Sequence, residues 1–111
     1  LFPYTTLFRS RLLDAPGVHS TWAGFTVTEA GPAGVTKASG LEHICKVLGQ
    51  DRADVVALGD GANDVEMLQW AGTSYAMGGA KPEAVAVADL RAPSCVDDGF
   101  AVVVEKILAS R

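Results

Sequence analysis

Apolar residues recur at helical spacing in two segments of the chain. The first segment covers about residues 37–48 and is followed by Gly49; its apolar positions are Ala38, Leu41, Ile44, Cys45 and Leu48. The second lies near the C-terminus, with apolar positions Phe100, Val103, Val104, Ile107 and Leu108. Residues three and four apart share one face of a helix, so both segments are predicted to form amphipathic helices. We expect Cys45 to lie in the core and Asp97 or Asp98 to cap the final helix.

The region between these two helices alternates between strand-like and helix-like patterns. Four consecutive apolar residues, 55–58, predict a strand covered on both faces, as in a parallel sheet. We then expect a helix over about 63–71 with Gly72 as its C′ residue, a strand over 73–77, a short helix from Pro82 to Ala88 and a last strand over 89–91. The expected fold class is therefore α/β, a partial doubly wound, Rossmann-like parallel sheet. Such sheets bind ligands at the carboxyl ends of their strands.

The N-terminal part of the chain has a weaker pattern. Residues 21–28 are rich in aromatic, β-branched and small side chains and predict a strand, within which Trp22 and Phe25 would pack. Gly and Pro at residues 31–34 then break the chain. The opening LFPYTTLFRS matches, residue by residue, the translation of a common short-read sequencing adaptor. We therefore expect residues 1–10 not to be native protein, and native sequence to begin near Arg11.

Composition narrows the function classes. The chain has 111 residues, 49% hydrophobic and 20% charged, which is enough to build a core and excludes disorder as its main description. The formal net charge of −4 disfavours a general nucleic-acid or membrane-surface partner, and no apolar run approaches a membrane span. Cys45 and Cys95 are too far apart in sequence to form a metal-type pair, so a reducing, cytoplasmic location is expected.

One motif places several polar side chains at the end of the predicted strand. Residues 59–64 read Gly-Asp-Gly-Ala-Asn-Asp, which places Asp60, Asn63 and Asp64 in a single strand-to-helix turn. Oxygen ligands without His or Cys favour Mg²⁺ over Zn²⁺. A structural alternative is that Asn63 and Asp64 only cap the helix, with Glu66 reaching back to Asn63 and Asp64 favoured by the helix dipole in the first turn. Asp60 is harder to explain in that way, because it ends an apolar strand where a buried, unpaired charge would be costly.

Lys37 is the second unusual residue. It lies at the start of a predicted helix, where a positive charge opposes the helix dipole at a cost of about 0.3–1 kcal/mol. A phosphate group between Lys37 and that helix end would make the interaction favourable. The alternative is an ordinary solvated lysine.

Taken together, these motifs resemble the haloacid-dehalogenase-like hydrolase superfamily, and most closely its branch of Cof-type sugar-phosphate phosphatases. The shared blocks are Gly-Val-Thr-Lys at 34–37, the strand and motif at 56–68, Ala-Met-Gly at 76–78, Ala-Asp at 88–89 and Asp-Asp-Gly-Phe-Ala at 97–101. The resemblance implies a phosphatase that acts on small phosphorylated metabolites through an aspartyl-phosphate intermediate, with Mg²⁺ as cofactor. It also implies that residues 11–34 end a cap domain and that residues 35–111 form the C-terminal half of the core.

The resemblance assigns roles to four residues. Asp60 would bind Mg²⁺, and Lys37 would hold the phosphoryl oxygens and act in catalysis. Asn63 would contact the substrate phosphate, while Asp64 would orient Lys37 or a metal-bound water.

The family's nucleophilic Asp-x-Asp motif occurs nowhere in this sequence, so we expect the chain as given to be inactive. Two alternatives remain open: a phosphoserine-phosphatase-like enzyme of the same superfamily, and a non-catalytic module that binds metal or phosphate. In the family, the missing nucleophile strand lies beside the strand at 55–59, so we also expect an unpaired apolar edge there. The oligomeric state is left open.

Overall fold

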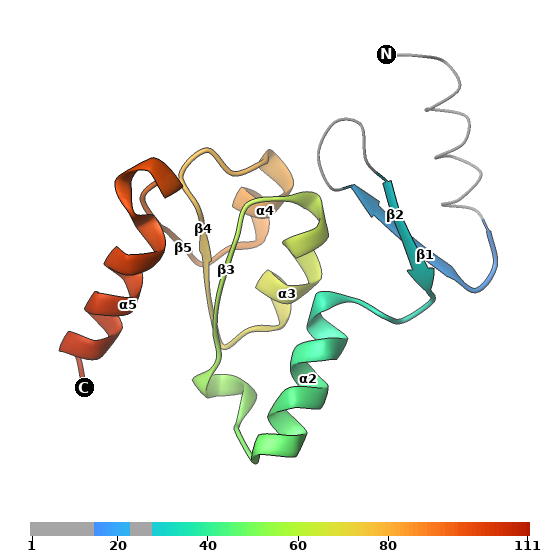
Figure 1. Cartoon of the computed structure of the whole chain (residues 1–111), viewed down its shortest axis with the longest axis horizontal. Coiled ribbons are helices and arrows are strands. Elements are labelled where there is room, and N and C mark those ends of the chain that lie inside the picture. The colour runs from blue at the N-terminus through green and yellow to red at the C-terminus, as the bar shows by residue number, and fades with distance from the viewer. Residues whose placement is uncertain (1–14, 23–27) are drawn as a thin grey trace.

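The computed structural model describes residues 15–22 and 28–111. Figure 1 shows a β-hairpin that one helix connects to an α/β unit. The elements, in chain order, are β1 (Val18–Trp22), β2 (Thr28–Pro32), α2 (Lys37–Leu48), η1 (Arg52–Asp54), β3 (Val56–Gly59), η2 (Ala62–Asp64), α3 (Val65–Trp70), β4 (Thr73–Ala76), α4 (Pro82–Val87), β5 (Leu90–Arg91), η3 (Cys95–Asp97) and α5 (Gly99–Ala109).

The α/β unit contains a parallel sheet with the strand order β3-β4-β5. Helix α3 connects β3 to β4 and helix α4 connects β4 to β5, as expected for parallel neighbours. The expected fold class is confirmed. In the described part of the chain, β3 has a strand neighbour on one side only, which matches the expected open edge.

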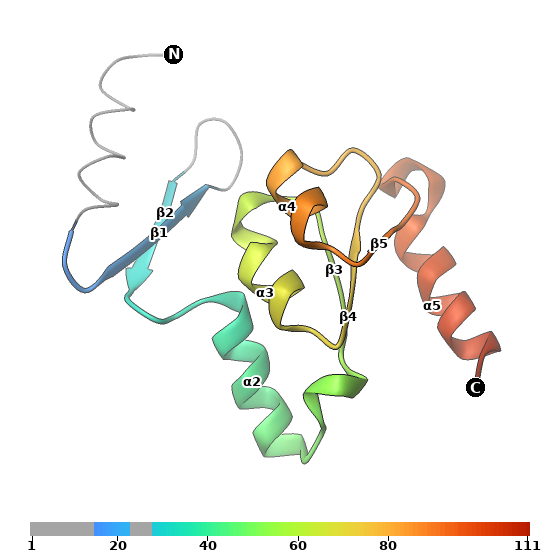
Figure 2. The same ribbon diagram turned by 180° about the vertical axis from the view of Figure 1, so that it is seen from behind.

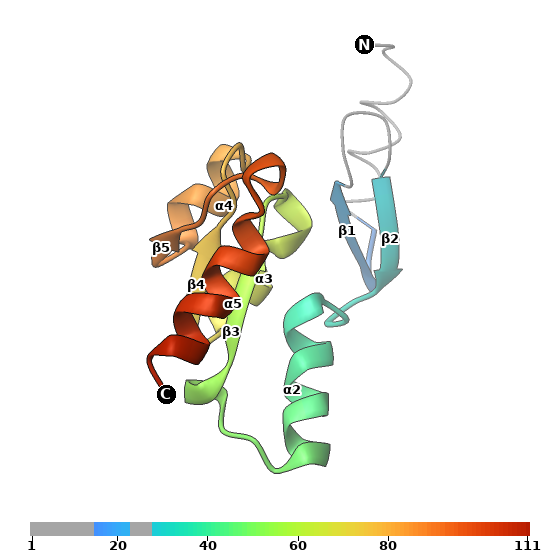
Figure 3. The ribbon, with the colours of Figure 1, turned by 60° about the vertical axis from the view of Figure 1, so that its left-hand side comes forward.

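Two apolar clusters cover the two faces of this sheet. Ala57 packs with residues of α3 and α4, whereas its neighbour Leu58 packs with Tyr75 and with α5. Successive residues of a strand point to opposite faces, so the apolar run supplies both clusters. Figure 2 shows α3 and α4 to the left of the strands and α5 to their right, and Figure 3 shows α5 in front of the strands.

Helices α2 and α4 have the expected bounds, and their caps explain them. Thr36 accepts a hydrogen bond from the backbone N–H of Ser39, and the Ser39 hydroxyl lies within bonding distance of the Thr36 N–H, which forms a capping box. Gly49 ends α2 at φ 67°, and Pro82 occupies the first turn of α4. Gly72 directly follows Ala71, the C-cap of α3, as expected; its backbone is not left-handed, and the backbone of Ala53 lies against it.

Several apolar positions are less buried than their spacing predicts. No residue of α2 is buried, and Cys45 is only half-buried, so its expected place in the core is wrong in the described structure. In α5, Val103 is buried but Phe100 is 64% exposed. Asp98 takes the N-cap position of α5 with φ 55°, yet its side chain makes no capping bond.

The N-terminal strand prediction is also corrected. The ends of the expected strand belong to two antiparallel strands, β1 and β2, whose register pairs Trp22 with Thr28. The turn comes later than expected, because Gly31 lies within β2 and the left-handed residue is Gly34. Residues 1–14, Phe25 and the side chain of Trp22 lie outside the described part, so the expectations made for them are not addressed. Across the described ranges, no helix combines the length and the apolarity that crossing a bilayer requires.

Candidate active site

A buried carboxylate organises the turn that follows β3. The Asp64 side chain is directed back toward the strand end, where its Oδ2 accepts hydrogen bonds from the backbone N–H groups of Asp60, at 2.8 Å, and Gly61, at 3.0 Å. Gly59 leaves room for this arrangement, because a Cβ there would lie 2.6 Å from the Cβ of Asp64. Asp64 is 4% exposed, so these contacts fix its carboxylate at the carboxyl end of the sheet.

The second oxygen of Asp64 binds the lysine that the sequence singled out. The Nζ of Lys37, the first residue of α2, donates a hydrogen bond to Asp64 Oδ1 at 2.5 Å. Burial alone would raise the pKa of Asp64, but the hydrogen bonds from Lys37, Asp60 and Gly61 outweigh it, and the pKa lies below its ordinary value. Asp64 is therefore an ionised partner that holds Lys37 in place.

The burial expected for Asp60 is wrong. Asp60 is exposed, and it is Asp64 that is buried. The main chain of Asp60, rather than its side chain, is bonded within the turn. The Asp60 N–H donates a hydrogen bond to the Asp64 carboxylate, and the Asp60 carbonyl accepts one from the backbone N–H of Lys81 at 2.8 Å. The desolvation cost expected for a buried, unpaired Asp60 does not arise, because its carboxylate stays in solvent.

The capping interpretation of Asn63 is also wrong. Helix α3 has Asp64 as its N-cap, and the capping-box contact in this turn joins Asp64 to Gly61. Asn63 instead lines a cavity of about 200 Å³ between the hairpin and the α/β unit. We expected a negative charge beside Lys37 at the start of α2. In this structure the Asp64 carboxylate carries that charge.

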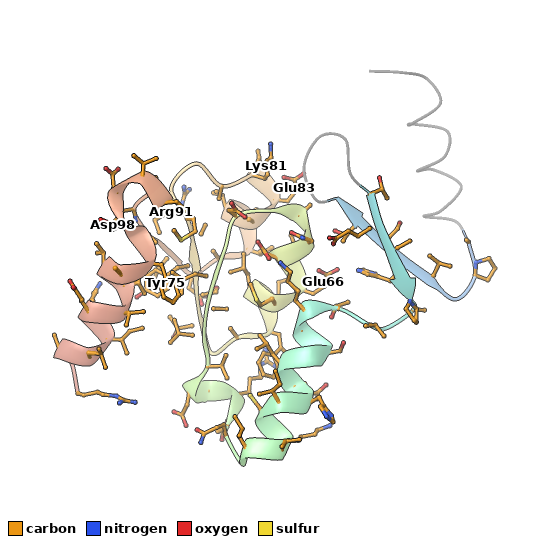
Figure 4. All side chains as sticks on the ribbon, in the orientation of Figure 1. Glu66, Tyr75, Lys81, Glu83, Arg91 and Asp98 are labelled. Carbon is orange, nitrogen blue, oxygen red and sulfur yellow. The ribbon has the colours of Figure 1, made fainter. Side chains whose placement is uncertain are left out.

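Sequence reasoning missed the hairpin side of this cavity. The cavity is lined by residues from the hairpin, the start of α2 and the turn before α3, namely His19, Thr21, Glu29, Ala30, Gly31, Val35, Thr36, Lys37, Asn63 and Glu66. His19 Nε2 lies 3.7 Å from Glu66 Oε1, and Figure 4 shows Glu66 in the space between the core and the hairpin. No local signal could pair these two residues, because they lie far apart in sequence.

The donor set fits Mg²⁺ in kind but supplies only part of a site. Within the described ranges, no three His, Cys, Asp or Glu side chains gather in a metal-binding arrangement. Both oxygens of Asp64 are already bonded, so Asp60 is the carboxylate of this turn that remains available. Mg²⁺ is often held by one or two carboxylates together with water and substrate phosphate, so Asp60 can serve as one ligand of such a site.

Comparisons with known proteins identify the family to which the chain belongs. A model of the haloacid dehalogenase-like hydrolases matches residues 5–104. The 5-amino-6-(5-phospho-D-ribitylamino)uracil phosphatase YbjI of Escherichia coli K12 is 47% identical over 75 residues, which are 68% of this chain and 28% of YbjI. Among solved structures, SMU.1108c from Streptococcus mutans UA159 superposes with a TM-score of 0.87 at 29% identity, over 94% of this chain and 40% of that one.

A further structural relative is a sugar phosphatase. The subclass IIB sugar phosphatase BT4131 has a TM-score of 0.83 and 26% identity, over 90% of this chain and 38% of its own. The chain thus spans between about a quarter and two fifths of the length of these three proteins.

Proposed function

The chain belongs to the haloacid dehalogenase-like hydrolases, and from this premise we propose that it forms the phosphate-binding part of an Mg²⁺-dependent phosphatase. The proposed substrates are small phosphorylated metabolites such as sugar phosphates. Relatives named as phosphatases, including a sugar phosphatase, support this class.

The observation that carries the proposal is the Lys37–Asp64 pair at the edge of the cavity. An ammonium group has three donors, and Asp64 occupies one of them. The Lys37 side chain is 49% exposed and lines the cavity beside Asn63. In the proposal, Lys37 donates to the phosphoryl oxygens, Asn63 donates its amide N–H to the same group, and Asp64 positions Lys37 without touching the substrate.

The local charge supports the need for a cation. Asp64 neutralises Lys37, and two further carboxylates, Glu29 and Glu66, line the same cavity. A phosphate monoester carries close to two negative charges at neutral pH, so it would enter a site that is already negative. Bound Mg²⁺ would supply the positive charge that offsets this repulsion, and Asp60 is the proposed protein ligand for it.

The sequence does not contain the family's motif for the covalent step. An aspartyl-phosphate intermediate needs a nucleophilic carboxylate, and the Asp-x-Asp motif that supplies it in the family is absent from this sequence. We therefore propose that the 111-residue chain binds phosphate without hydrolysing esters. Metal-dependent hydrolysis of an aryl phosphate that Asp60→Ala abolishes would contradict this.

Calorimetric titration with inorganic phosphate, with and without Mg²⁺, tests the proposal. Binding should require Mg²⁺ and should weaken at least tenfold in Lys37→Met and in Asp60→Asn. Lys46→Met is the matched control. Lys46 lies on the same helix, is exposed and pairs with Glu42 of that helix at 3.8 Å, away from the cavity. Equal phosphate affinity in wild type, Lys37→Met and Asp60→Asn would refute the proposal.

The proposed compartment is the cytoplasm. Cys45 and Cys95 are both free thiols, which supports a reducing environment. Alkylation of both thiols in protein isolated without reductant is the expected result, and a disulfide in that material would count against this location.

A further inference from the structure

The hairpin presents one polar face to the cavity. In the antiparallel register His19 pairs with Gly31, and Thr21 pairs with Glu29. Alternate residues of a strand point to the same side, and directly paired residues share it. His19, Thr21, Glu29 and Gly31 therefore lie on one face, and all four line the cavity that also contains Lys37.

Two carboxylates face the space in which the remainder of a bound phosphate ester would lie. Glu29 comes from β2, and Glu66 comes from α3 on the other side of the cavity. Their neighbours are the imidazole of His19 and the hydroxyl of Thr21, which donate and accept hydrogen bonds. Among the described residues that line the cavity, Lys37 and His19 are the basic ones, and Asp64 already compensates the charge of Lys37.

We propose that Glu29 and Glu66 determine substrate specificity by excluding phosphate esters that carry a second anionic group. The accepted class is monophosphate esters of uncharged, hydroxyl-rich compounds, whose hydroxyl groups donate to the carboxylates and bond to His19 and Thr21. The inference rests on the proposed function, because it requires the phosphate to be bound at Lys37. Two unit charges about 6 Å apart in water repel enough to change an affinity about threefold, and a lower local dielectric constant increases this factor.

A matched pair of ligands isolates the second charge. Glycerol 3-phosphate and 3-phosphoglycerate differ only in carrying a hydroxymethyl group or a carboxylate at the far end. Titrations of the 111-residue chain with Mg²⁺ at pH 8 should show glycerol 3-phosphate binding at least threefold more tightly than 3-phosphoglycerate.

Variants then assign the effect to residues. Glu29→Gln and Glu66→Gln should each reduce the preference for glycerol 3-phosphate by improving the binding of 3-phosphoglycerate. Glu42→Gln, an exposed change on α2 outside the cavity lining, should leave the preference unchanged. Equal binding of the two esters to wild type, or a preference that persists in both cavity variants, would overturn the proposal.

Titration with inorganic phosphate separates this inference from the proposed function. If phosphate binds in a Lys37-dependent way but the two esters bind equally, only the specificity proposal fails. If inorganic phosphate does not bind in the presence of Mg²⁺, the proposed function fails and the specificity proposal fails with it.

Discussion

Replacing Lys37 by methionine should destabilise the chain through the carboxylate that it leaves behind. The Asp64 side chain is 6% exposed, whereas that of Lys37 is 49% exposed. Losing a charged partner of a buried group costs about 1.5–3 kcal/mol. Solvent screening at the half-exposed lysine and the two backbone donors that Asp64 keeps reduce this cost. We expect Lys37→Met to lower the free energy of unfolding by about 1–2 kcal/mol at pH 7.

A double-mutant cycle measures the interaction energy between Lys37 and Asp64 separately from the other effects of each substitution. Urea unfolding followed by circular dichroism would be measured for wild type, Lys37→Met, Asp64→Asn and the double variant. Once Asp64 is neutral, removing Lys37 should cost almost nothing, so the coupling energy should be about 1–2 kcal/mol. Lys46→Met should change stability by less than about 0.5 kcal/mol. Additive effects of the two substitutions would refute the reasoning.

The same pair predicts a dependence on pH with a defined sign. The pKa of Asp64 is lower in the folded chain than its ordinary value of 3.8. The ionised carboxylate therefore contributes stability that is fully present above about pH 4 and is lost as the pH falls through the lower, folded value. The difference in stability between wild type and Lys37→Met should accordingly shrink in acid. A difference that stays constant between pH 7 and pH 3 would show that it does not arise from this ion pair.

Three further predictions follow from other contacts. Gly59→Ala places a methyl group 2.6 Å from the Cβ of Asp64; it should lower stability by about 1–3 kcal/mol in urea unfolding and abolish phosphate binding. Gly40→Ala, whose new Cβ meets nothing within 4 Å, is the control and should stabilise α2. The Asp89 carboxylate accepts hydrogen bonds from the N–H and the hydroxyl of buried Ser74, at 2.9 and 3.1 Å. Asp89→Ala should therefore lower the free energy of unfolding by about 1–3 kcal/mol in the same assay, and Asp89→Asn should lower it less. The open edge of β3 should make the chain associate at micromolar concentration; a sharp monomer by light scattering after gel filtration would contradict this.

The sequence predicted helices and strands well where neighbouring residues of the chain fix their ends or their pattern. The bounds of α2 depend on Thr36 at one end and Gly49 at the other, and Pro82 marks the start of α4. The apolar run of β3 predicted a strand covered on both faces, and the packing of Ala57 and Leu58 on opposite sides confirms it.

The predictions that failed depended on contacts distant in sequence or on details of a turn. Spacing shows that α2 has an apolar stripe but not what would cover it, and no residue of α2 is buried in the described structure. Gly72 follows the C-cap of α3 as predicted, but the sequence does not show that the approach of the Ala53 backbone requires this residue to be small. His19 became part of the candidate site only through the pairing of β1 with β2, which no periodicity indicated.

The structure also changes the reason for linking Lys37 to phosphate. A lysine in the first turn of a helix opposes the dipole by about 0.3–1 kcal/mol. A charge-assisted hydrogen bond contributes about 1.5–3 kcal/mol, so the bond to Asp64 is sufficient to explain why Lys37 lies there. Its position alone therefore no longer requires a bound anion. What favours phosphate is that an ammonium group with three donors uses one on Asp64 and is half-exposed beside Asn63 at the cavity. A purely structural lysine would give the stability coupling with Asp64 but no Mg²⁺-dependent binding of phosphate, so the two measurements together separate a positioned ligand-binding group from a structural ion pair.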